Sequence, residues 1–482
     1  MSSLSLIVFL FSSLSFIFFC FLDNGFAGAD EIAGGRHLIS VASLIPATTC
    51  SSSMPKVADD RKSSSAKVVH RNGPCSKLTN NNKATLNEFL IQDESRVKSI
   101  HSRAKINSAS KTNTPLQDTD SISIPAKSGF SLGTRNFIVT VGLGTPKRDL
   151  SLIFDTGSDL TWTQCQPCAG SCYSQQEPIF DPSLSKSYKN VSCSSPQCSA
   201  LISATGKQPR CLSSTNTCTY GIQYGDRSLS VGYLATETLT LSPTDIFPNL
   251  YFGCGENNRG LFNGAAGLIG LGRDPLSLVS QTAGKYGKYF SYCLPSSSST
   301  GHLTFGKGKS NFANAKFTSL SSNSQLPSFY FIDIIGIKVG LKILPISRSV
   351  FTNSGGTIID SGTVITRLPP TAYTALKTEF RKQMSDYNLT NPRTLLDTCY
   401  DFSSYKSILV PKISFFFAGN VELSVPPNGI FFPASTAQMC LGFAGNTDDT
   451  SLGVFGNVQQ QTLEVIYDVA GGKLGFAAGG CS

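Results

Sequence analysis

The stretch Leu150-Ser-Leu-Ile-Phe-Asp-Thr-Gly-Ser158 joins a short apolar run to a turn that carries a carboxylate. A second stretch of the same kind, Gly356-Thr-Ile-Ile-Asp-Ser-Gly-Thr363, places Asp360 205 residues after Asp155. Short apolar runs bounded by turn residues are typical of buried β-strands. Two copies of one strand-and-turn pattern indicate an internal repeat.

A second pair of matching segments supports the repeat. Ala266-Gly-Leu-Ile-Gly-Leu-Gly272 follows the first Asp turn, and Gly453-Val-Phe-Gly-Asn457 follows the second. Each half therefore consists of a strand, an Asp turn, a long β-rich stretch and an apolar strand rich in glycine. The sequence predicts an all-β, bilobal fold with lobes over residues 121–322 and 323–482. The lobes would meet near residues 318–328, with a cleft between them.

Symmetry between two such lobes would bring the two Asp turns together. Two carboxylates in contact cannot both be ionised, so Asp155 and Asp360 would share one proton and titrate as a pair. The ionised member can take a proton from water while the protonated member donates to a carbonyl oxygen, which hydrolyses an amide at acid pH. A single Asp-Thr-Gly is a common turn, so it is the duplication that favours catalysis. The predicted supporting residues are the glycines and hydroxyls of the two turns: Thr156, Gly157, Ser158, Ser361, Gly362 and Thr363.

The composition agrees with a β-rich globular protein. Of the 482 residues, 40% are hydrophobic and only 15% are charged, against roughly 25% in an average globular protein. This balance excludes a disordered chain and a coiled coil. The 32 Phe and 15 Tyr favour strands. A single apolar run, Leu4 to Leu22, is long enough to enter a membrane, so the sequence excludes a multi-span transporter.

The first 29 residues are predicted to be a secretory signal peptide. The apolar run is followed by Ala27-Gly-Ala29, which has the small residues of a signal cleavage site. No Lys or Arg precedes the run, and its length leaves a signal anchor as the alternative. The predicted destination is the secretory pathway, ending in the extracellular space, the cell wall or the vacuole.

Residues 30–120 differ from the rest by their positive charge. Twelve Lys or Arg and five Asp or Glu lie between Ser51 and Lys111, in a chain of formal net charge +9. One amphipathic helix is predicted in an otherwise polar segment, from apolar residues at near-helical spacing: Leu86, Phe89, Leu90, Val97 and Ile100. We interpret the segment as a removable pro-segment whose positive charge covers an acidic site. A solvated linker and a basic arm for nucleic acid are the alternatives.

Fifteen cysteines point to an oxidising compartment. Twelve of them lie in the C-terminal three-quarters of the chain, which suggests six disulfides. The alternative is a zinc or redox site at Cys165, Cys168 and Cys172, but the sequence lacks the second Cys or His pair that a structural zinc site usually needs. We therefore expect neither a metal nor a cofactor. Asn190 and Asn388 begin Asn-X-Ser/Thr tripeptides and are predicted glycosylation sites.

Other catalytic chemistries find little support in the sequence. Only His302 lies beyond residue 120, so a Ser-His-Asp, Cys-His or His-based zinc site would depend on a single histidine. The glycine-rich segment 264–272 lacks the Gly-Lys-Ser/Thr of a phosphate loop. Its glycines are better explained by close packing of the backbone.

At the residues quoted above, the sequence resembles the pepsin-like aspartic endopeptidases, over most of residues 137–478. It is most similar to the plant nepenthesin-type branch, which carries a cysteine-rich insertion after the first Asp turn. His70-Arg-Asn-Gly-Pro-Cys75 resembles the subgroup of a chloroplast-nucleoid aspartic protease credited with DNA binding. The resemblance implies a pepsin-like fold, protein or peptide substrates, pepstatin sensitivity and a monomer, and it leaves the plastid as an alternative location.

The resemblance also implies roles for the residues of the two turns. Asp155 and Asp360 would be the catalytic dyad. Ser158 and Thr363 would support the carboxylates. Thr156 and Ser361 would tie the two loops together.

Two further features follow from the same resemblance. Tyr224 would be the tyrosine of a flap that closes over substrate, with Trp162 as its hydrogen-bond partner. The implied disulfides are Cys165–Cys168, Cys172–Cys254, Cys193–Cys218, Cys198–Cys211, Cys293–Cys481 and Cys399–Cys440. Sequence alone does not establish this connectivity.

We therefore expect a secreted aspartic endopeptidase that is made as a zymogen. Two other classes stay open: a catalytically inactive binding or inhibitor protein on the same fold, and a DNA-binding protease of plastid nucleoids. The presence of Asp155, Asp360 and Tyr224 argues against the first class. The Lys and Arg of the pro-segment are not interleaved with aromatic residues, which weakens the case for nucleic acid as a partner.

Overall fold

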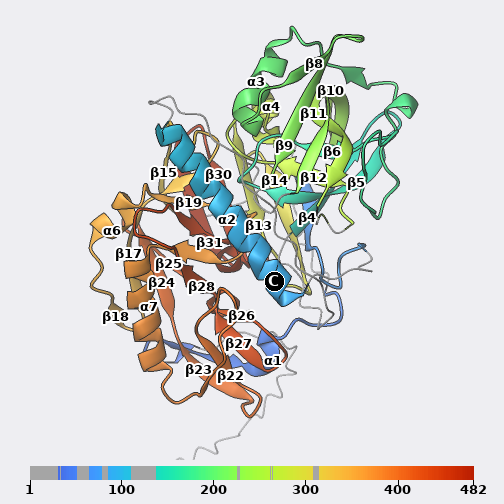
Figure 1. Cartoon of the computed structure of the whole chain (residues 1–482). Helices are drawn as coiled ribbons and strands as arrows, with labels where there is room; N and C mark the ends of the chain where they lie inside the picture. The colour runs from blue at the N-terminus through green and yellow to red at the C-terminus, as the bar shows by residue number, and fades with distance from the viewer. Residues whose placement is uncertain are drawn as a thin grey trace, which may run out of the picture.

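Two β-rich lobes make up most of the described chain, and a helix of the N-terminal segment lies between them (Figure 1). The computed structural model describes residues 31–32, 34–51, 64–78, 85–109, 137–224, 228–260, 262, 264–307 and 314–481. The predicted signal peptide, residues 1–29, lies outside them. Within these ranges, no helix combines the length and the apolar character needed to cross a membrane.

The N-terminal lobe is built around the first copy of the repeat. Strands β4 (Phe137–Leu143) and β5 (Arg148–Asp155) pair antiparallel, and β12 (Gly267–Gly270) runs parallel beside β5. The other main elements of the lobe are β6 (Trp162–Gln164), α3 (Pro196–Thr205), β8 (Arg210–Leu212), β9 (Thr217–Gln223), β10 (Leu229–Ser242), β11 (Asp245–Arg259), β13 (Tyr289–Cys293) and β14 (Thr300–Phe305).

The C-terminal lobe repeats this arrangement. Here β19 (Thr357–Ile359) precedes the second Asp turn, and β29 (Gly453–Phe455) runs parallel beside it, as β12 does beside β5. The other main elements are β20 (Thr366–Leu368), α7 (Pro370–Gln383), β22 (Cys399–Asp401), β23 (Ser407–Pro411), β24 (Ile413–Phe417), β27 (Gln438–Leu441), β30 (Leu463–Asp468) and β31 (Lys473–Ala478). Strand β15 (Lys316–Ser321) precedes the predicted boundary at residues 322 and 323 and pairs with β31 of this lobe. The predicted all-β, bilobal architecture is confirmed.

The glycines of the paired segments are needed for close packing at the Asp turns. A Cβ on Gly270 would lie 2.1 Å from the carbonyl oxygen of Asp159. In the second lobe, a Cβ on Gly456 would lie 2.5 Å from the carbonyl oxygen of Val364. A side chain at either position would push the neighbouring turn away, so the glycines follow from the fold rather than from phosphate binding.

A sheet beneath the cleft connects the two lobes. Its strands follow the order β15, β31, β30, β13, β14, β3 and β4, and all the pairings along it are antiparallel. Strand β3 (Ser64–His70) comes from the N-terminal segment and lies between β14 and β4. Val68 of β3 is fully buried in the main hydrophobic core.

The predicted amphipathic helix is present as α2 (Leu86–Ala109). It begins with a capping box, because the backbone N–H of Thr85 donates to the Glu88 carboxylate and that of Glu88 donates to Thr85 Oγ1. The predicted apolar positions face the protein: Phe89 and Leu90 pack among residues of the C-terminal lobe, as do Val97 and Ile100 about two and three turns further on. Figure 1 shows α2 running along the boundary between the lobes.

The described parts of the N-terminal segment contain more regular structure than the sequence indicated. We expected one helix in an otherwise polar stretch, but β2 (Arg36–Ser40) pairs with β23 of the C-terminal lobe, and β3 enters the sheet between the lobes. A disulfide between Cys50 and Cys75, which the sequence analysis did not assign, links two parts of this segment. The segment is therefore attached to both lobes.

Four of the six disulfides implied by the resemblance are wrong. In place of Cys165–Cys168, Cys172–Cys254, Cys193–Cys218 and Cys198–Cys211, the structure contains Cys165–Cys254, Cys168–Cys172, Cys193–Cys211 and Cys198–Cys218. The other two, Cys293–Cys481 and Cys399–Cys440, are present as expected.

Strand pairing explains the different connectivity. Strands β6 and β11 run parallel, and the backbone N–H of Cys165 donates to Gly255, which brings Cys165 within 5.4 Å (Cα–Cα) of Cys254. Cys168 then bonds to Cys172 within the following loop. Helix α3 packs against β9 and places Cys198 beside Cys218, which leaves Cys193 for Cys211.

The position of β3 in the sheet leads to a stability prediction. Replacing Val68 with Ala should lower the free energy of unfolding of the precursor by about 1.5–3 kcal/mol, because the deletion removes buried methyl groups and leaves a cavity. The matched control is K67A, since Lys67 is exposed on the same strand. Urea unfolding with disulfides intact measures both, and equal stability of the two variants would contradict a structural role for β3.

Candidate active site

The two predicted carboxylates lie at the ends of equivalent strands, one in each lobe. Asp155 is the last residue of β5, and Asp360 directly follows β19. Both strands are apolar and buried, so they carry the carboxylates into the interior, where Asp155 is 1% and Asp360 0% exposed. The structure thus brings together two residues that are 205 positions apart in the chain.

The two turns are tied together by a reciprocal pair of hydrogen bonds. The backbone N–H of Thr156 donates to Ser361 Oγ at 3.0 Å, and the backbone N–H of Ser361 donates to Thr156 Oγ1 at 2.9 Å. All four groups are buried, so an unmade bond would leave a buried N–H without a partner. This contact fixes one lobe relative to the other at the level of the carboxylates.

Each carboxylate is also held within its own turn by two donors. Asp155 accepts from the backbone N–H of Gly157 at 3.0 Å and from Ser158 Oγ at 2.7 Å. In the second turn, Asp360 accepts from the backbone N–H of Gly362 at 3.0 Å and from Thr363 Oγ1 at 2.6 Å. The two sets of contacts are equivalent, as expected for a repeated structure.

The turn glycines let the two carboxylates approach each other. A Cβ on Gly157 would lie 2.6 Å from Asp360 Oδ1, and a Cβ on Gly362 would lie 2.4 Å from Asp155 Oδ1. Each glycine therefore makes room for the carboxylate of the opposite lobe. A larger residue at either position would displace the opposite carboxylate and the Arg96 guanidinium.

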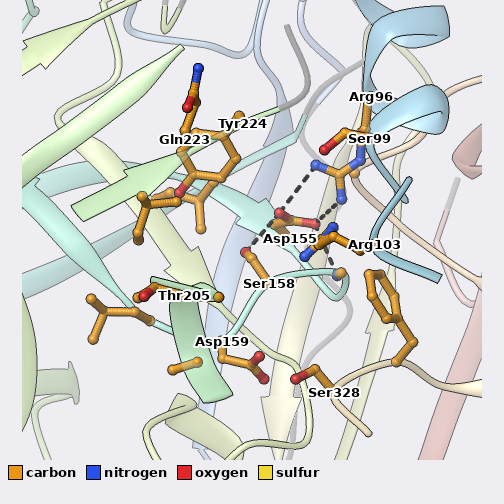
Figure 2. A pocket seen from close by; sticks show the side chains of 18 of the residues that line it. Arg96, Ser99, Arg103, Asp155, Ser158, Asp159, Thr205, Gln223, Tyr224 and Ser328 are labelled. Carbon is orange, nitrogen blue, oxygen red and sulfur yellow. Dashed lines mark hydrogen bonds and ion pairs between the residues drawn. The ribbon is translucent and has the colours of Figure 1, made fainter. Parts of the chain in front are cut away.

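A guanidinium group from the N-terminal segment lies across both carboxylates. Arg96 of α2 places Nη2 2.7 Å from Asp155 Oδ1 and 2.9 Å from Asp360 Oδ2, and its Nε donates to Asp360 Oδ2 at 3.0 Å. Figure 2 shows Arg96 reaching from the helix toward Asp155. In the sequence, Arg96 is one of many basic residues of the segment, because spacing along a helix does not reveal what its charged side faces.

The surroundings of the two carboxyl groups shift their pKa values in opposite directions. Burial alone would raise the pKa of Asp155, but the Arg96 charge and the hydrogen bonds from Ser158 and Gly157 outweigh burial and lower that pKa below its usual value. Burial and the neighbouring charge of Asp155 raise the pKa of Asp360 despite Arg96. The pair is thus suited to hold one proton between two carboxyl groups.

The predicted flap residues also meet in the structure. Trp162 follows the first Asp turn, and its Nε1 donates to Tyr224 Oη at 2.8 Å. Tyr224 follows β9, and its ring, like that of Trp162, packs against the edge or face of Phe262. The next three residues, 225–227, lie outside the described ranges.

A cavity of about 780 Å³ lies between α2, the first Asp turn and Tyr224 (Figure 2). Besides residues already named, it is lined by Arg103 of α2, by Asp159 and by residues 324–329. Burial raises the pKa of Asp159 to about 7, although hydrogen bonds from Ser328 and from the backbone of Asp274 lower it. Neither Arg103 nor Asp159 was expected from the sequence. For Asp159, the only local signal was its position directly after Asp-Thr-Gly-Ser.

The remaining predicted positions lie away from this cavity. Asn190 and Asn388 are exposed, which is the environment that glycosylation requires. Among the described residues, no three His, Cys, Asp or Glu side chains form a group that could hold a metal ion.

The reciprocal contact between the turns predicts the effect of one substitution. Replacing Thr156 with Val keeps the shape but removes the acceptor of the buried Ser361 N–H, and the free energy of unfolding should fall by about 1–3 kcal/mol. Thr352 on helix α6 (Arg348–Asn353) is exposed, and T352V is the matched control, with an expected change within about 0.5 kcal/mol. A T156V protein as stable as the control would show that this contact does not hold the lobes together.

Curated relatives share nearly the whole length of the chain. It is 54% identical to an aspartyl protease family protein of Arabidopsis thaliana, over 94% of this chain and 95% of that protein. It is 48% identical to aspartyl protease AED1 of the same plant, over 96% of both chains. To aspartic proteinase nepenthesin-1 of Nepenthes gracilis it is 40% identical, over 72% of this chain and 79% of that protein.

Solved structures share the fold at lower identity. The crystal structure of Basic 7S globulin from soybean superposes with a TM-score of 0.57 at 21% identity, covering 71% of this chain and 93% of that one. Conglutin gamma from lupine seeds gives a TM-score of 0.55, also at 21% identity, covering 71% of this chain and 91% of that one.

Two family models match the two lobes separately. The model described as Xylanase inhibitor N-terminal matches residues 137–307, and that described as Xylanase inhibitor C-terminal matches residues 329–478. With these matches and the close relatives, the chain belongs to the plant branch of the pepsin-like aspartic proteases and is an aspartic-type protease.

Proposed function

We propose that this protein is an endopeptidase that cleaves protein substrates at acid pH, using Asp155 and Asp360, and that it is made as an inactive precursor. The observation that carries the proposal is the position of Arg96, whose guanidinium pairs with both buried carboxylates at once. A basic side chain from a helix in the cleft occupies the place where water and substrate would have to bind. The arrangement fits a peptidase whose own N-terminal segment blocks its active site.

The mechanism follows from the proton shared by the carboxylates. In the open cleft, the ionised carboxylate accepts a proton from a water molecule, and the water oxygen attacks the carbonyl carbon of the peptide bond. The protonated carboxyl group donates its proton to the carbonyl oxygen, which gives a neutral tetrahedral diol. Proton transfer to the amide nitrogen then breaks the C–N bond and releases the amine and the carboxylic acid. In the closed precursor, the pKa of Asp155 is lowered and that of Asp360 is raised, so Asp155 is the ionised member in that state.

The same electrostatics make the block sensitive to pH. In the closed precursor, Arg96 acts against burial and holds the pKa of Asp155 below its usual value. A carboxylate whose pKa is lower in the closed state stabilises that state above its pKa in the open form. The stabilisation is lost as the pH falls through the lowered value. Acidification therefore weakens the docking of α2 and exposes the carboxylates.

The compartment, the inhibitor sensitivity and the oligomeric state are also part of the proposal. Seven disulfides in the described chain support folding in an oxidising compartment, and thus passage through the secretory pathway. Pepstatin sensitivity and a monomeric state are proposed from family membership. No described feature favours the plastid, nucleic-acid binding or an inactive inhibitor over this proposal.

The guanidinium of Arg96 should set the pH at which the precursor opens. Replacing Arg96 with Gln removes the charge-assisted hydrogen bonds to both carboxylates, so the pH midpoint at which purified precursor converts itself should rise by about one unit or more. The control is K98Q, because Lys98 lies on the same helix with its side chain 68% exposed to solvent. Gel analysis after incubation from pH 2.5 to 7.5 gives both midpoints. If R96Q converts at the same pH as K98Q, Arg96 does not close the site.

Cleavage should depend on both carboxylates. Asp155→Asn and Asp360→Asn should each reduce cleavage of a denatured protein by about two to four orders of magnitude, and their precursors should stay uncut in acid. Pepstatin should have the same effect on the wild type. The exposed Asp401 supplies the control variant, Asp401→Asn, which should behave as wild type.

A different outcome would redirect the proposal. Folded wild-type protein that has released α2 but cleaves nothing between pH 2.5 and 7.5 would favour an inactive binding protein on the same fold.

A further inference from the structure

A second buried ion pair joins α2 to the cleft, next to the carboxylates. Arg367 of β20 is only 1% exposed, and its Nη2 lies 2.9 Å from Asp93 Oδ2 and 3.3 Å from Glu94 Oε2. Its Nη1 donates to the carbonyl oxygen of Ile365 at 2.6 Å. Both acidic partners therefore belong to the helix that has to leave before substrate can enter.

The Asp93 carboxylate receives two further donors from the cleft. The backbone N–H of Val364 donates to Asp93 Oδ1 at 2.6 Å, and that of Ile365 donates to Asp93 Oδ2 at 3.2 Å. Val364 directly follows Thr363, the residue whose hydroxyl holds Asp360. The C-terminal lobe thus presents one guanidinium and two backbone N–H groups to a single carboxylate, beside the proposed reacting centre.

Departure of α2 leaves this group of donors without its anion. A guanidinium stays protonated in proteins, so these donors keep their attraction for an anion. Among the described residues, its Nε has no hydrogen-bond partner, and the ion pairs of its guanidinium are those with Asp93 and Glu94. The open cleft therefore presents a preformed group of donors that suits a negatively charged group.

We propose that Arg367, together with the N–H groups of Val364 and Ile365, binds an Asp or Glu side chain of the substrate. The acidic pair of α2 then occupies a substrate subsite, just as Arg96 occupies the reacting centre. The inference rests on the proposed peptidase activity of the same cleft, and it adds a preference that the activity alone does not require.

The geometry limits where the acidic residue of the substrate lies. Asp93 precedes Arg96 by three residues, which is about 4.5 Å along the axis of a helix. An extended peptide advances by about 3.3 Å per residue. The preferred acidic residue should therefore lie about one to three residues from the bond that is cleaved.

The test uses acid-activated protein and pairs of peptides. Each pair carries Asp or Asn at one position, scanned over four positions on either side of the cleaved bond. At one position, kcat/KM should favour Asp by about tenfold to a hundredfold at pH 5.5, because hydrogen bonds to a charged group are lost with Asn. The preference should shrink toward pH 3, since a free Asp side chain, with a pKa near 3.9, becomes protonated there while Arg367 stays charged.

Variants of Arg367 test whether this side chain causes the preference. R367Q should bring the Asp-to-Asn ratio to about one, and R367K should retain part of it because the charge remains without the planar fork. R381Q, which removes an exposed arginine from α7, should keep the wild-type ratio. The wild-type ratio and its pH dependence do not require any variant to fold.

The outcomes separate the inference from the proposed function. Cleavage of denatured casein with an Asp-to-Asn ratio near one at every position overturns the carboxylate subsite and leaves the peptidase intact. A ratio that stays high in R367Q also overturns it, because another group would then bind the acid. Absence of cleavage of casein and of every peptide would reject both proposals together.

Discussion

Two carboxylates buried in contact are stable only if they share a proton or if a cation lies between them. The first condition suits an open cleft in acid, and the second is met in this structure by Arg96. Much of the surrounding architecture serves the same constraint. The apolar strands β5 and β19 bury the two groups, the turn glycines let them approach, and the reciprocal contact between Thr156 and Ser361 fixes their separation.

The repeat made the centre of the molecule predictable. An apolar run followed by Asp, a hydroxyl residue and Gly appears twice, so the strands, the turns and their mutual contact could be predicted without any coordinates. The helix of residues 86–109 was predictable for a similar reason, because its apolar residues recur with the helical period. The two ionic contacts of this helix with the cleft could not be predicted, because Asp93 and Arg96 look like ordinary charged residues of an amphipathic helix. Only the docked position reveals that one faces Arg367 and the other faces the carboxylates.

The wrong disulfides and the missed strand both depend on contacts between residues that are far apart in the sequence. The seven cysteines from Cys165 to Cys218 lie so close in sequence that many pairings are compatible with chain length. The choice depends on the register of β8 with β9, which sets Cys211 opposite Cys218, and on the packing of α3. The strand at residues 64–70 was missed because its sequence, Ser-Ser-Ala-Lys-Val-Val-His, has a weak strand pattern of its own. It becomes a strand because β14 and β4 offer partners on both sides.

The position of β3 also affects what can happen to the protein when its precursor is processed. If β3 were lost with the rest of the N-terminal segment, β4 and β14 would become two open strand edges separated by an empty slot. Open edges of this kind recruit other chains and promote aggregation. A soluble processed form must therefore retain residues 64–70 as a noncovalent subunit or refill the slot with another stretch of its own chain.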